Sequence, residues 1–262
     1  MKYILSGGLI PVMLLICIGV LNTYSQPPLF SYEVYTNGKG DTLKYRLLNP
    51  DYDTMRKYPL VIFLHGSGER GHDNNAQLKW GVMNFATDQN MKLYPAIVVA
   101  PQCPANSSWA NIEERRNGGI TFHAVPSKPM LLLRELTEQL KKQQAVDTNR
   151  IYITGLSMGG FGTFDALARY PDLFAAAVPV CGGGDPSKAN LFTHVPVWIF
   201  TGAEDPAVAP QLSLDMAEAL TKAGAHPGYT QYPEVGHFSW LAAYSDPMMM
   251  AWLFRQNKQL RK

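Results

Sequence analysis

The sequence carries little charge, and this scarcity excludes several classes of function. Asp, Glu, Lys and Arg make up 17% of the 262 residues, and the formal net charge is only +2. A charge this small does not favour nucleic acid or an acidic polymer as a partner. The chain also has no run of like charges, no heptad pattern and no internal repeat. A coiled coil or a solenoid is therefore not expected.

Cysteine is scarce as well, and the spacings typical of metal sites are missing. The chain has three cysteines and six histidines, but no His-x-x-x-His or Cys-x-x-Cys pair. Zinc sites are usually built on such spacings. We therefore expect neither a catalytic metal nor a cofactor.

The N-terminal segment has the features of a secretory signal peptide. Lys2 gives a positive start, and the apolar run at 9–21 is too short to span a membrane. Small residues then mark a cleavage site, so residues 1–25 are expected to be removed, leaving a catalytic domain at 26–262 that is secreted or periplasmic without a stable membrane anchor. Cys17 leaves a lipoprotein alternative open, although the residue before it is a bulky isoleucine.

Patterns of polarity predict strands and helices that alternate along most of the chain. The expected strands are 31–36, 42–47, 60–64, 96–100, 151–154, 174–180, 197–201 and 229–232, and the expected helices are 128–144, 160–170, 211–223 and 248–262. This order predicts an α/β fold, with a mostly parallel sheet and helices on both faces. Ligands bind such sheets at the carboxyl ends of the strands. Residues 105–126 have no periodicity, which is typical of a functional loop or lid.

The segment RIYITGLSMGGFG at 150–162 contains the most informative motif of the chain. A buried strand leads into G-x-S-x-G, and a helix follows. In this context the pattern predicts a nucleophile elbow, with Ser157 at the tip of a strained turn. The glycines on either side are needed because a Cβ would clash where strand and helix nearly touch.

A serine nucleophile needs a base, and the base needs a carboxylate that orients it. Asp205 follows a buried strand and is the expected acid, with its neighbour Glu204 as the competitor. His237 lies after Gly236 in a late loop and is the expected base. The order Ser157, Asp205, His237 is the one that accompanies this type of elbow.

Two amides are needed to bind the developing oxyanion. The backbone of Met158, directly after the nucleophile, is one candidate. The other is Ser67, in the glycine-rich loop that follows the strand at 60–64. Gly66 in the same loop is a candidate substrate contact, and its alternative role is a tight turn. His65 is expected to brace this loop by hydrogen bonding rather than to act in catalysis.

Four other residues have roles that the sequence leaves open. Trp109 has asparagine and serine residues as sequence neighbours, and it is either an exposed platform for substrate or a buried side chain. We treat it as a candidate substrate contact. His123 lies in the suspected lid and could touch substrate. Cys103 and Cys181 follow strands that the expected topology separates by about 14 Å, so only a loop that folds back could join them in a disulfide.

The motifs VIFLHGSGERG, APQCP, ITGLSMGGFGT, FTGAEDPAV and GHFSW, in this order, resemble the α/β-hydrolase superfamily. They are most similar to its secreted carboxylesterase and feruloyl-esterase-like branch, which is related to the catalytic domain of prolyl oligopeptidases. The resemblance covers about residues 30–260 and implies the same triad and oxyanion hole. A large cap insertion after the strand at 174–180 is missing, so an open site is expected.

The leading hypothesis is a secreted serine esterase that acts on small or polysaccharide-linked esters, such as acetyl or feruloyl esters. A serine peptidase could use the same triad, but about 30 residues before the first strand cannot encode a propeller domain. A non-catalytic binding domain on a hydrolase scaffold is the third hypothesis. The sequence does not predict the acyl group or the oligomeric state.

Overall fold

The computed structural model describes residues 29–50, 55–114 and 118–260. The predicted signal peptide and Cys17 lie outside these residues. Among the helices described, none is long and apolar enough to cross a membrane.

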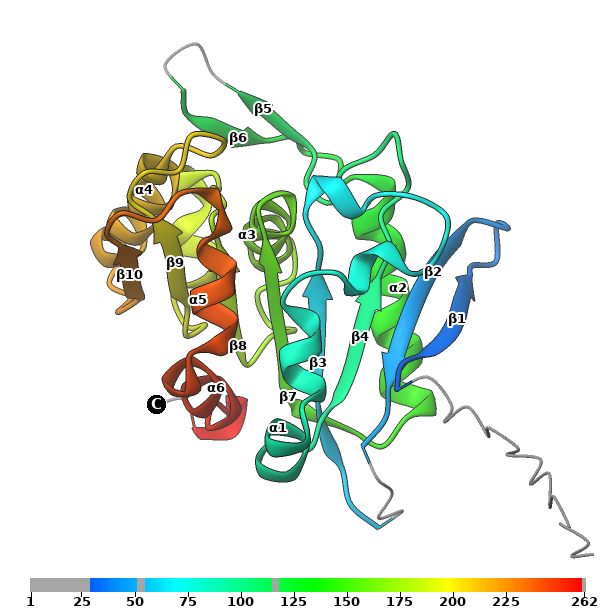
Figure 1. Cartoon of the computed structure of the whole chain (residues 1–262). Coiled ribbons are helices and arrows are strands. Elements are labelled where there is room, and N and C mark those ends of the chain that lie inside the picture. The colour runs from blue at the N-terminus through cyan, green and yellow to red at the C-terminus, as the bar shows by residue number, and fades with distance from the viewer. Residues whose placement is uncertain (1–28, 51–54, 115–117, 261–262) are drawn as a thin grey trace, which may run out of the picture.

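The fold is built on an eight-stranded sheet with the order β1-β2-β4-β3-β7-β8-β9-β10 (Figure 1). The strands are β1 (Ser31–Thr36), β2 (Thr42–Leu48), β3 (Tyr58–Leu64), β4 (Ile97–Pro101), β7 (Val146–Leu156), β8 (Ala176–Val180), β9 (Trp198–Gly202) and β10 (Gly228–Tyr232). Strand β2 pairs antiparallel with β1 and with β4, and the other pairings are parallel. The predicted α/β fold is confirmed, as is a mostly parallel sheet.

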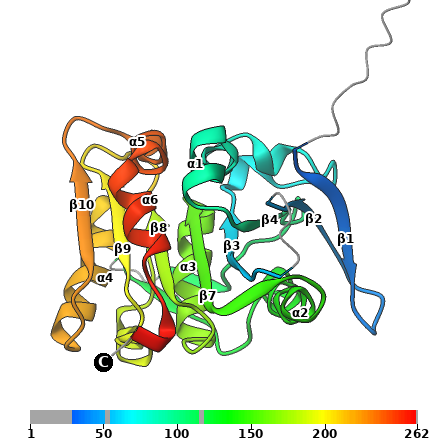
Figure 2. The same ribbon diagram turned by 90° about the horizontal axis from the view of Figure 1, so that it is seen from below.

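Helices cover both faces of this sheet (Figure 2). One face carries α2 (Lys128–Gln143), α3 (Met158–Arg169) and α4 (Pro210–Lys222), and the other carries α1 (Asp88–Leu93), α5 (Trp240–Ser245) and α6 (Pro247–Phe254). Each face has its own hydrophobic core, because successive side chains of a strand point to opposite sides. In β3, Leu60 and Ile62 belong to the core under α2 and α3, whereas Val61 and Phe63 belong to the core under α5 and α6.

The predicted helices at 128–144, 160–170 and 211–223 are confirmed as α2, α3 and α4 to within two residues at either end. Helix α2 begins where predicted because the Ser127 hydroxyl accepts a hydrogen bond from the Met130 amide at 3.2 Å. The closing helix is shorter than predicted and ends at Phe254. Beyond it, the Asn257 side chain accepts the Gln259 amide at 2.9 Å and forms a turn that competes with the helix.

The lack of periodicity at 105–126 predicted an irregular segment, but part of this segment is regular. It contains a small hairpin formed by β5 (Ile112–Glu114) and β6 (Ile120–Phe122), which projects above the carboxyl ends of the main strands (Figure 1). Strands of three residues are too short to produce a recognisable alternation.

Between β8 and β9, the chain forms only the 3-10 helix Pro186–Phe192, so no large cap domain is inserted there, as the sequence indicated.

Candidate active site

Ser157 lies at the sharp turn between β7 and α3, with the strained backbone that its motif predicts. Its φ is +53° and its ψ is −119°, a conformation that a side chain rarely adopts. The turn needs glycine at two positions. A Cβ on Gly155 would lie 2.5 Å from the Gly159 carbonyl oxygen, and one on Gly159 would overlap the carbonyl of Leu64. Strand and helix can therefore approach closely enough to expose the serine side chain.

The structure brings Ser157, His237 and Asp205 together from three separate loops. The Ser157 hydroxyl and His237 Nε2 lie 3.0 Å apart, and His237 Nδ1 lies 2.7 Å from Asp205 Oδ2. Since a carboxylate only accepts, Nδ1 carries the proton and Nε2 is left to accept from the serine hydroxyl. This is the tautomer that a general base requires.

Asp205 is held rigidly at the end of β9. Its side chain is fully buried, and Oδ1 accepts hydrogen bonds from the amides of Ala207 at 2.9 Å and Val208 at 3.0 Å. Both carboxylate oxygens are therefore used, one to shape the loop and one to orient His237. Glu204, the competing carboxylate, is exposed, and among the described residues it is Asp205 that pairs with His237 Nδ1.

The two predicted oxyanion amides belong to residues that begin helices. Met158 is the first residue of α3, and Ser67 is the first residue of the 3-10 helix Ser67–Glu69. Amides of a first helical turn have no acceptor inside the helix, so they can donate to a ligand. Both residues line the same cavity as Ser157 and His237.

The loop that contains Ser67 is braced from below, as expected for His65. The His65 ring accepts the Cys103 amide at Nε2, 2.9 Å away, and Nδ1 donates to the Gly66 carbonyl at 2.6 Å. Burial lowers the pKa of His65 to about 4, so the ring stays neutral and keeps this pattern at neutral pH. Arg70 adds a second brace by donating to the carbonyls of Ser67 at 3.0 Å and Ser107 at 3.3 Å.

A cavity of about 630 Å³ opens at Ser157. Its larger apolar side chains come from the hairpin, α3, the loop after β9 and the start of α4: Ile112, Ile120, Met158, Phe161, Val208 and Leu212. Its polar side chains are Ser67, Ser108, Glu114, Ser157 and His237. The site is thus open to solvent on one side and covered by the hairpin on another, and the apolar wall suits an acyl chain or ring.

A family model of esterases matches residues 37–243. The chain belongs to the Esterase family. Relatives of this esterase-family chain include poly(3-hydroxyalkanoate) depolymerase C of Paucimonas lemoignei, 31% identical over 125 residues that cover 48% of this chain and 28% of the relative. Another is the "Probable feruloyl esterase C" of Aspergillus niger, 26% identical over 212 residues, which cover 78% of this chain and 69% of the relative.

Among solved structures, a thermostable esterase is 39% identical, with a TM-score of 0.81 over 87% of this chain and 63% of the other. A ferulic acid esterase at 18% identity, with a TM-score of 0.65, shares the fold over 86% of this chain and 98% of its own. The chain spans only part of several relatives, 28% of the depolymerase among them. These findings confirm the predicted membership of the α/β-hydrolase superfamily and its esterase branch.

The prediction that Trp109 contacts substrate is wrong. The side chain is fully buried, its Nε1 donates to the His65 carbonyl at 3.1 Å, and its ring packs 5.2 Å from the His65 ring. Its polar sequence neighbours suggested exposure, but the indole points inward against α3. Gly66 is likewise buried and is not among the cavity-lining residues. A Cβ there would lie 2.8 Å from Leu156 Cδ1, so packing explains this glycine.

Sequence reasoning missed two features of the cavity wall. Phe161 packs against the core and also lines the cavity from the first turn of α3. The other feature is the hairpin: Ile112, Glu114 and Ile120 line the cavity but lie in the segment without periodicity, where no strand was predicted. The spacing of Phe161 from Ser157, one helical turn, is a signal that could have placed it at the site.

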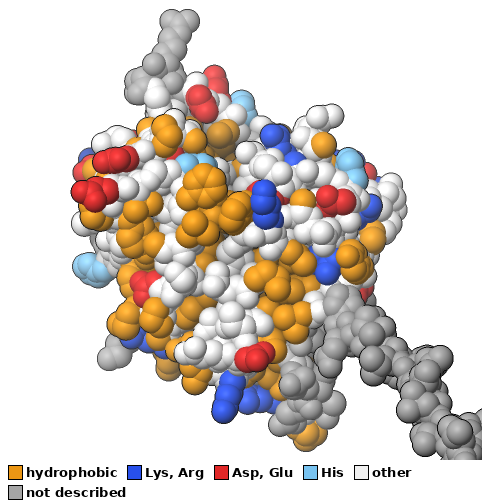
Figure 3. Space-filling model, viewed as in Figure 1, with side chains coloured by type: hydrophobic (Ala, Val, Ile, Leu, Met, Phe, Trp, Pro, Cys, Tyr) orange, Lys and Arg blue, Asp and Glu red, His pale blue; other side chains and the backbone are white. Residues whose placement is uncertain are grey.

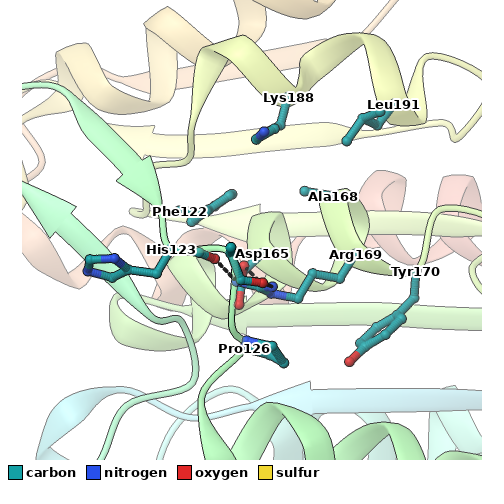
Figure 4. A pocket seen from close by; sticks show the side chains of 10 residues that line it. Phe122, His123, Pro126, Asp165, Ala168, Arg169, Tyr170, Lys188 and Leu191 are labelled. Atoms are coloured by element: carbon teal, nitrogen blue, oxygen red, sulfur yellow. Dashed lines mark hydrogen bonds and ion pairs between the residues drawn. The ribbon is translucent and has the colours of Figure 1, made fainter.

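The segment just after the hairpin is tied to the nucleophile helix by Arg169, which pairs with a buried carboxylate on the same helix. Asp165 and Arg169 on α3 pair at 2.7 Å, and Arg169 also donates to the carbonyls of His123 at 2.7 Å and Ala124 at 3.0 Å, just after β6. Figure 4 shows this pair at the centre of a second cavity, about 490 Å³, which His123 lines. His123 is therefore not among the residues that line the cavity at Ser157.

Cys181 lies beside the triad. Its Sγ, a carboxylate oxygen of Asp205 and a ring nitrogen of His237 all lie within 4.8 Å of one another. These residues do not fit a metal ion, because both ring nitrogens of His237 already hydrogen-bond within the triad. Burial raises the pKa of Cys181 to about 12, which disfavours the thiolate that a metal requires. Cys103 and Cys181 are both buried free thiols, so the disulfide that the sequence left open is not formed.

Proposed function

We propose that the chain is a carboxylic ester hydrolase that works through Ser157, His237 and Asp205. The observation that carries this proposal is the continuous hydrogen-bonded chain from Ser157 to His237 to Asp205, at 3.0 and 2.7 Å. It lies at the mouth of a cavity with an apolar wall, in a chain of the Esterase family. A serine without such partners would be a poor nucleophile at neutral pH.

In the proposed reaction, the Ser157 hydroxyl oxygen attacks the ester carbonyl while its proton moves to His237 Nε2. The amides of Met158 and Ser67 donate to the resulting oxyanion, and Asp205 stabilises the imidazolium. His237 then gives its proton to the alcohol oxygen, the bond from carbonyl carbon to that oxygen breaks, and an acyl group remains on Ser157. Water repeats these steps with His237 as its base, which releases the acid and restores the serine.

We propose that the substrates are esters linked to extracellular polysaccharide. Two observations support this class: relatives are named as feruloyl and acetylxylan esterases, and the site is open on one side rather than enclosed by a cap. A polymer can reach Ser157 at such a surface without threading through a channel. Export by a cleaved signal at 1–25 is part of the same proposal, because it would bring the enzyme to its substrate.

The test is hydrolysis of an ester panel by the chain from residue 26 onward, with Ser157→Ala as the blank. The panel runs from acetyl to octanoyl nitrophenyl esters and includes methyl ferulate, acetylated xylan and an aminoacyl-proline anilide. We expect ester turnover that falls at least 10³-fold in the variant. Wild-type ester turnover in Ser157→Ala would refute the proposal, and cleavage of the anilide without ester turnover would favour a peptidase instead.

A further inference from the structure

Three aromatic rings pack together beside the catalytic histidine, and none of them belongs to the residues that line the cavity at Ser157. Phe238 directly follows His237, and its ring lies 4.7 Å from Trp240 and 5.8 Å from Trp80. Trp240 is buried and packs against the His237 ring at 5.1 Å. Phe238, by contrast, is 55% exposed. Figure 3 shows hydrophobic side chains gathered on this front face, over the region of α5.

The position of this group is fixed from both sides. Trp80 interacts electrostatically with Glu69, a buried carboxylate in the same 3-10 helix as Ser67. Lys79 covers one face of Trp80, with Nζ 5.1 Å from the ring centroid. Phe238 is in turn held between Trp80 and Trp240. Its exposed ring is therefore a supported surface and not the end of a mobile side chain.

The chemistry of the proposed reaction assigns a place to the leaving alcohol. His237 Nε2 must protonate the alcohol oxygen, so the alcohol leaves along the histidine ring. The cavity under the hairpin extends from Ser157 toward α3 and α4, and Phe238 is not among its lining residues. The acyl group and the alcohol thus have separate surfaces, one inside the cavity and one beside His237.

We propose that Phe238, supported by Trp80, is the subsite for the leaving alcohol, and that it binds the pyranose ring of a sugar. This inference rests on the proposed ester hydrolysis. A pyranose presents an apolar C–H face that stacks on an aromatic ring, while its hydroxyls and its opposite face remain in water. Phe238 is more than half exposed and is not among the residues that line the cavity at Ser157. An aromatic alcohol bound there would leave its outer apolar face wet, so the exposure favours the sugar.

The experiment compares alcohols that carry the same acyl group. Wild type and Phe238→Ala are assayed on a mono-acetylated methyl xylopyranoside, on phenyl acetate and on ethyl acetate. In Phe238→Ala, kcat/KM for the xyloside ester relative to ethyl acetate should fall about fivefold, the equivalent of one ring-stacking contact. Phe238→Trp should restore the ratio. Leu93→Ala, an equally exposed apolar residue on α1 at the opposite end of the sheet, is the matched control and should leave it unchanged.

Two results would overturn the subsite alone. The first is an equal loss on all three esters, which would mean that Phe238 only positions His237. The second is a ratio that falls for phenyl acetate but not for the xyloside ester, which would assign the surface to aromatic alcohols. If wild type turns over none of the esters while Leu93→Ala and wild type are both folded, the proposed function itself fails, and the subsite fails with it.

Discussion

Replacing Asp205 with asparagine should lower kcat by about 10⁴ while leaving the fold intact. Oδ1 of Asp205 accepts the amides of Ala207 and Val208, and Oδ2 accepts from His237 Nδ1. Asparagine has one carbonyl oxygen, and the two backbone amides keep it, because an amide NH₂ cannot accept from them. The NH₂ group therefore faces His237.

The histidine must then change its tautomer. With a donor opposite Nδ1, that nitrogen has to accept, so the ring proton moves to Nε2 and points at the Ser157 hydroxyl. A protonated Nε2 cannot take the serine proton. In serine proteases the same substitution costs about 10⁴ in kcat, equivalent to about 5 kcal/mol of transition-state stabilisation. We expect a similar loss here because the distances of 3.0 and 2.7 Å define the same constellation.

The assay is kcat on nitrophenyl acetate, with thermal unfolding followed in parallel to check the fold. Glu204→Gln is the matched control, since it removes the neighbouring exposed carboxylate and should leave kcat within twofold of wild type. The reasoning would be refuted if Asp205→Asn retained more than a tenth of the wild-type kcat. It would also fail if Glu204→Gln caused the larger loss.

Two further predictions concern the elements that support the site. Burial raises the pKa of Asp165 from 3.8 to about 6, so the folded chain binds this proton more tightly than the unfolded chain. The resulting stabilisation is complete below pH ~4 and is lost as pH rises through 6, a change of about 3 kcal/mol. Denaturant unfolding at pH 4 and pH 7 should show this drop in wild type relative to Asp165→Asn, and parallel profiles would contradict it. Trp109→Ala should lower the free energy of unfolding by about 3–5 kcal/mol, because it empties a buried site. In Trp109→Phe, if it is folded, KM should change less than threefold. A tenfold rise in KM without loss of stability would instead indicate that Trp109 contacts substrate.

The meeting of Ser157, His237 and Asp205 could be predicted from the sequence, because each residue lies in a local sequence pattern. The elbow around Ser157 needs a strand, two glycines and a helix within about ten residues, and all of these are visible in the sequence. Asp205 and His237 follow strands whose carboxyl ends must meet at one edge of a parallel sheet. Topology then brings the three together without any information on side-chain packing.

The cavity wall could not be predicted, because distant contacts decide it. The burial of Trp109 depends on the His65 carbonyl, 44 residues away, and not on the polar residues beside it. The hairpin is tied to α3 by Arg169, which donates to carbonyls 45 and 46 residues earlier in the chain. Strands of three residues are too short to show an alternation from which this hairpin could be predicted.

The same distant contacts explain how the nucleophile and the oxyanion loop keep their relative position. A Cβ on Gly162 would overlap Trp109, so α3 packs directly on this ring. Trp109 in turn donates to the carbonyl of His65, the residue before Gly66, and the His65 ring is fixed by Cys103. One packed unit therefore positions Ser157, through α3, and the Ser67 amide, through His65. Oxyanion stabilisation depends on donors that are already in place when charge develops. If Ser67 supplies such a donor, as proposed, the buried Trp109 contributes to catalysis by keeping that donor in position.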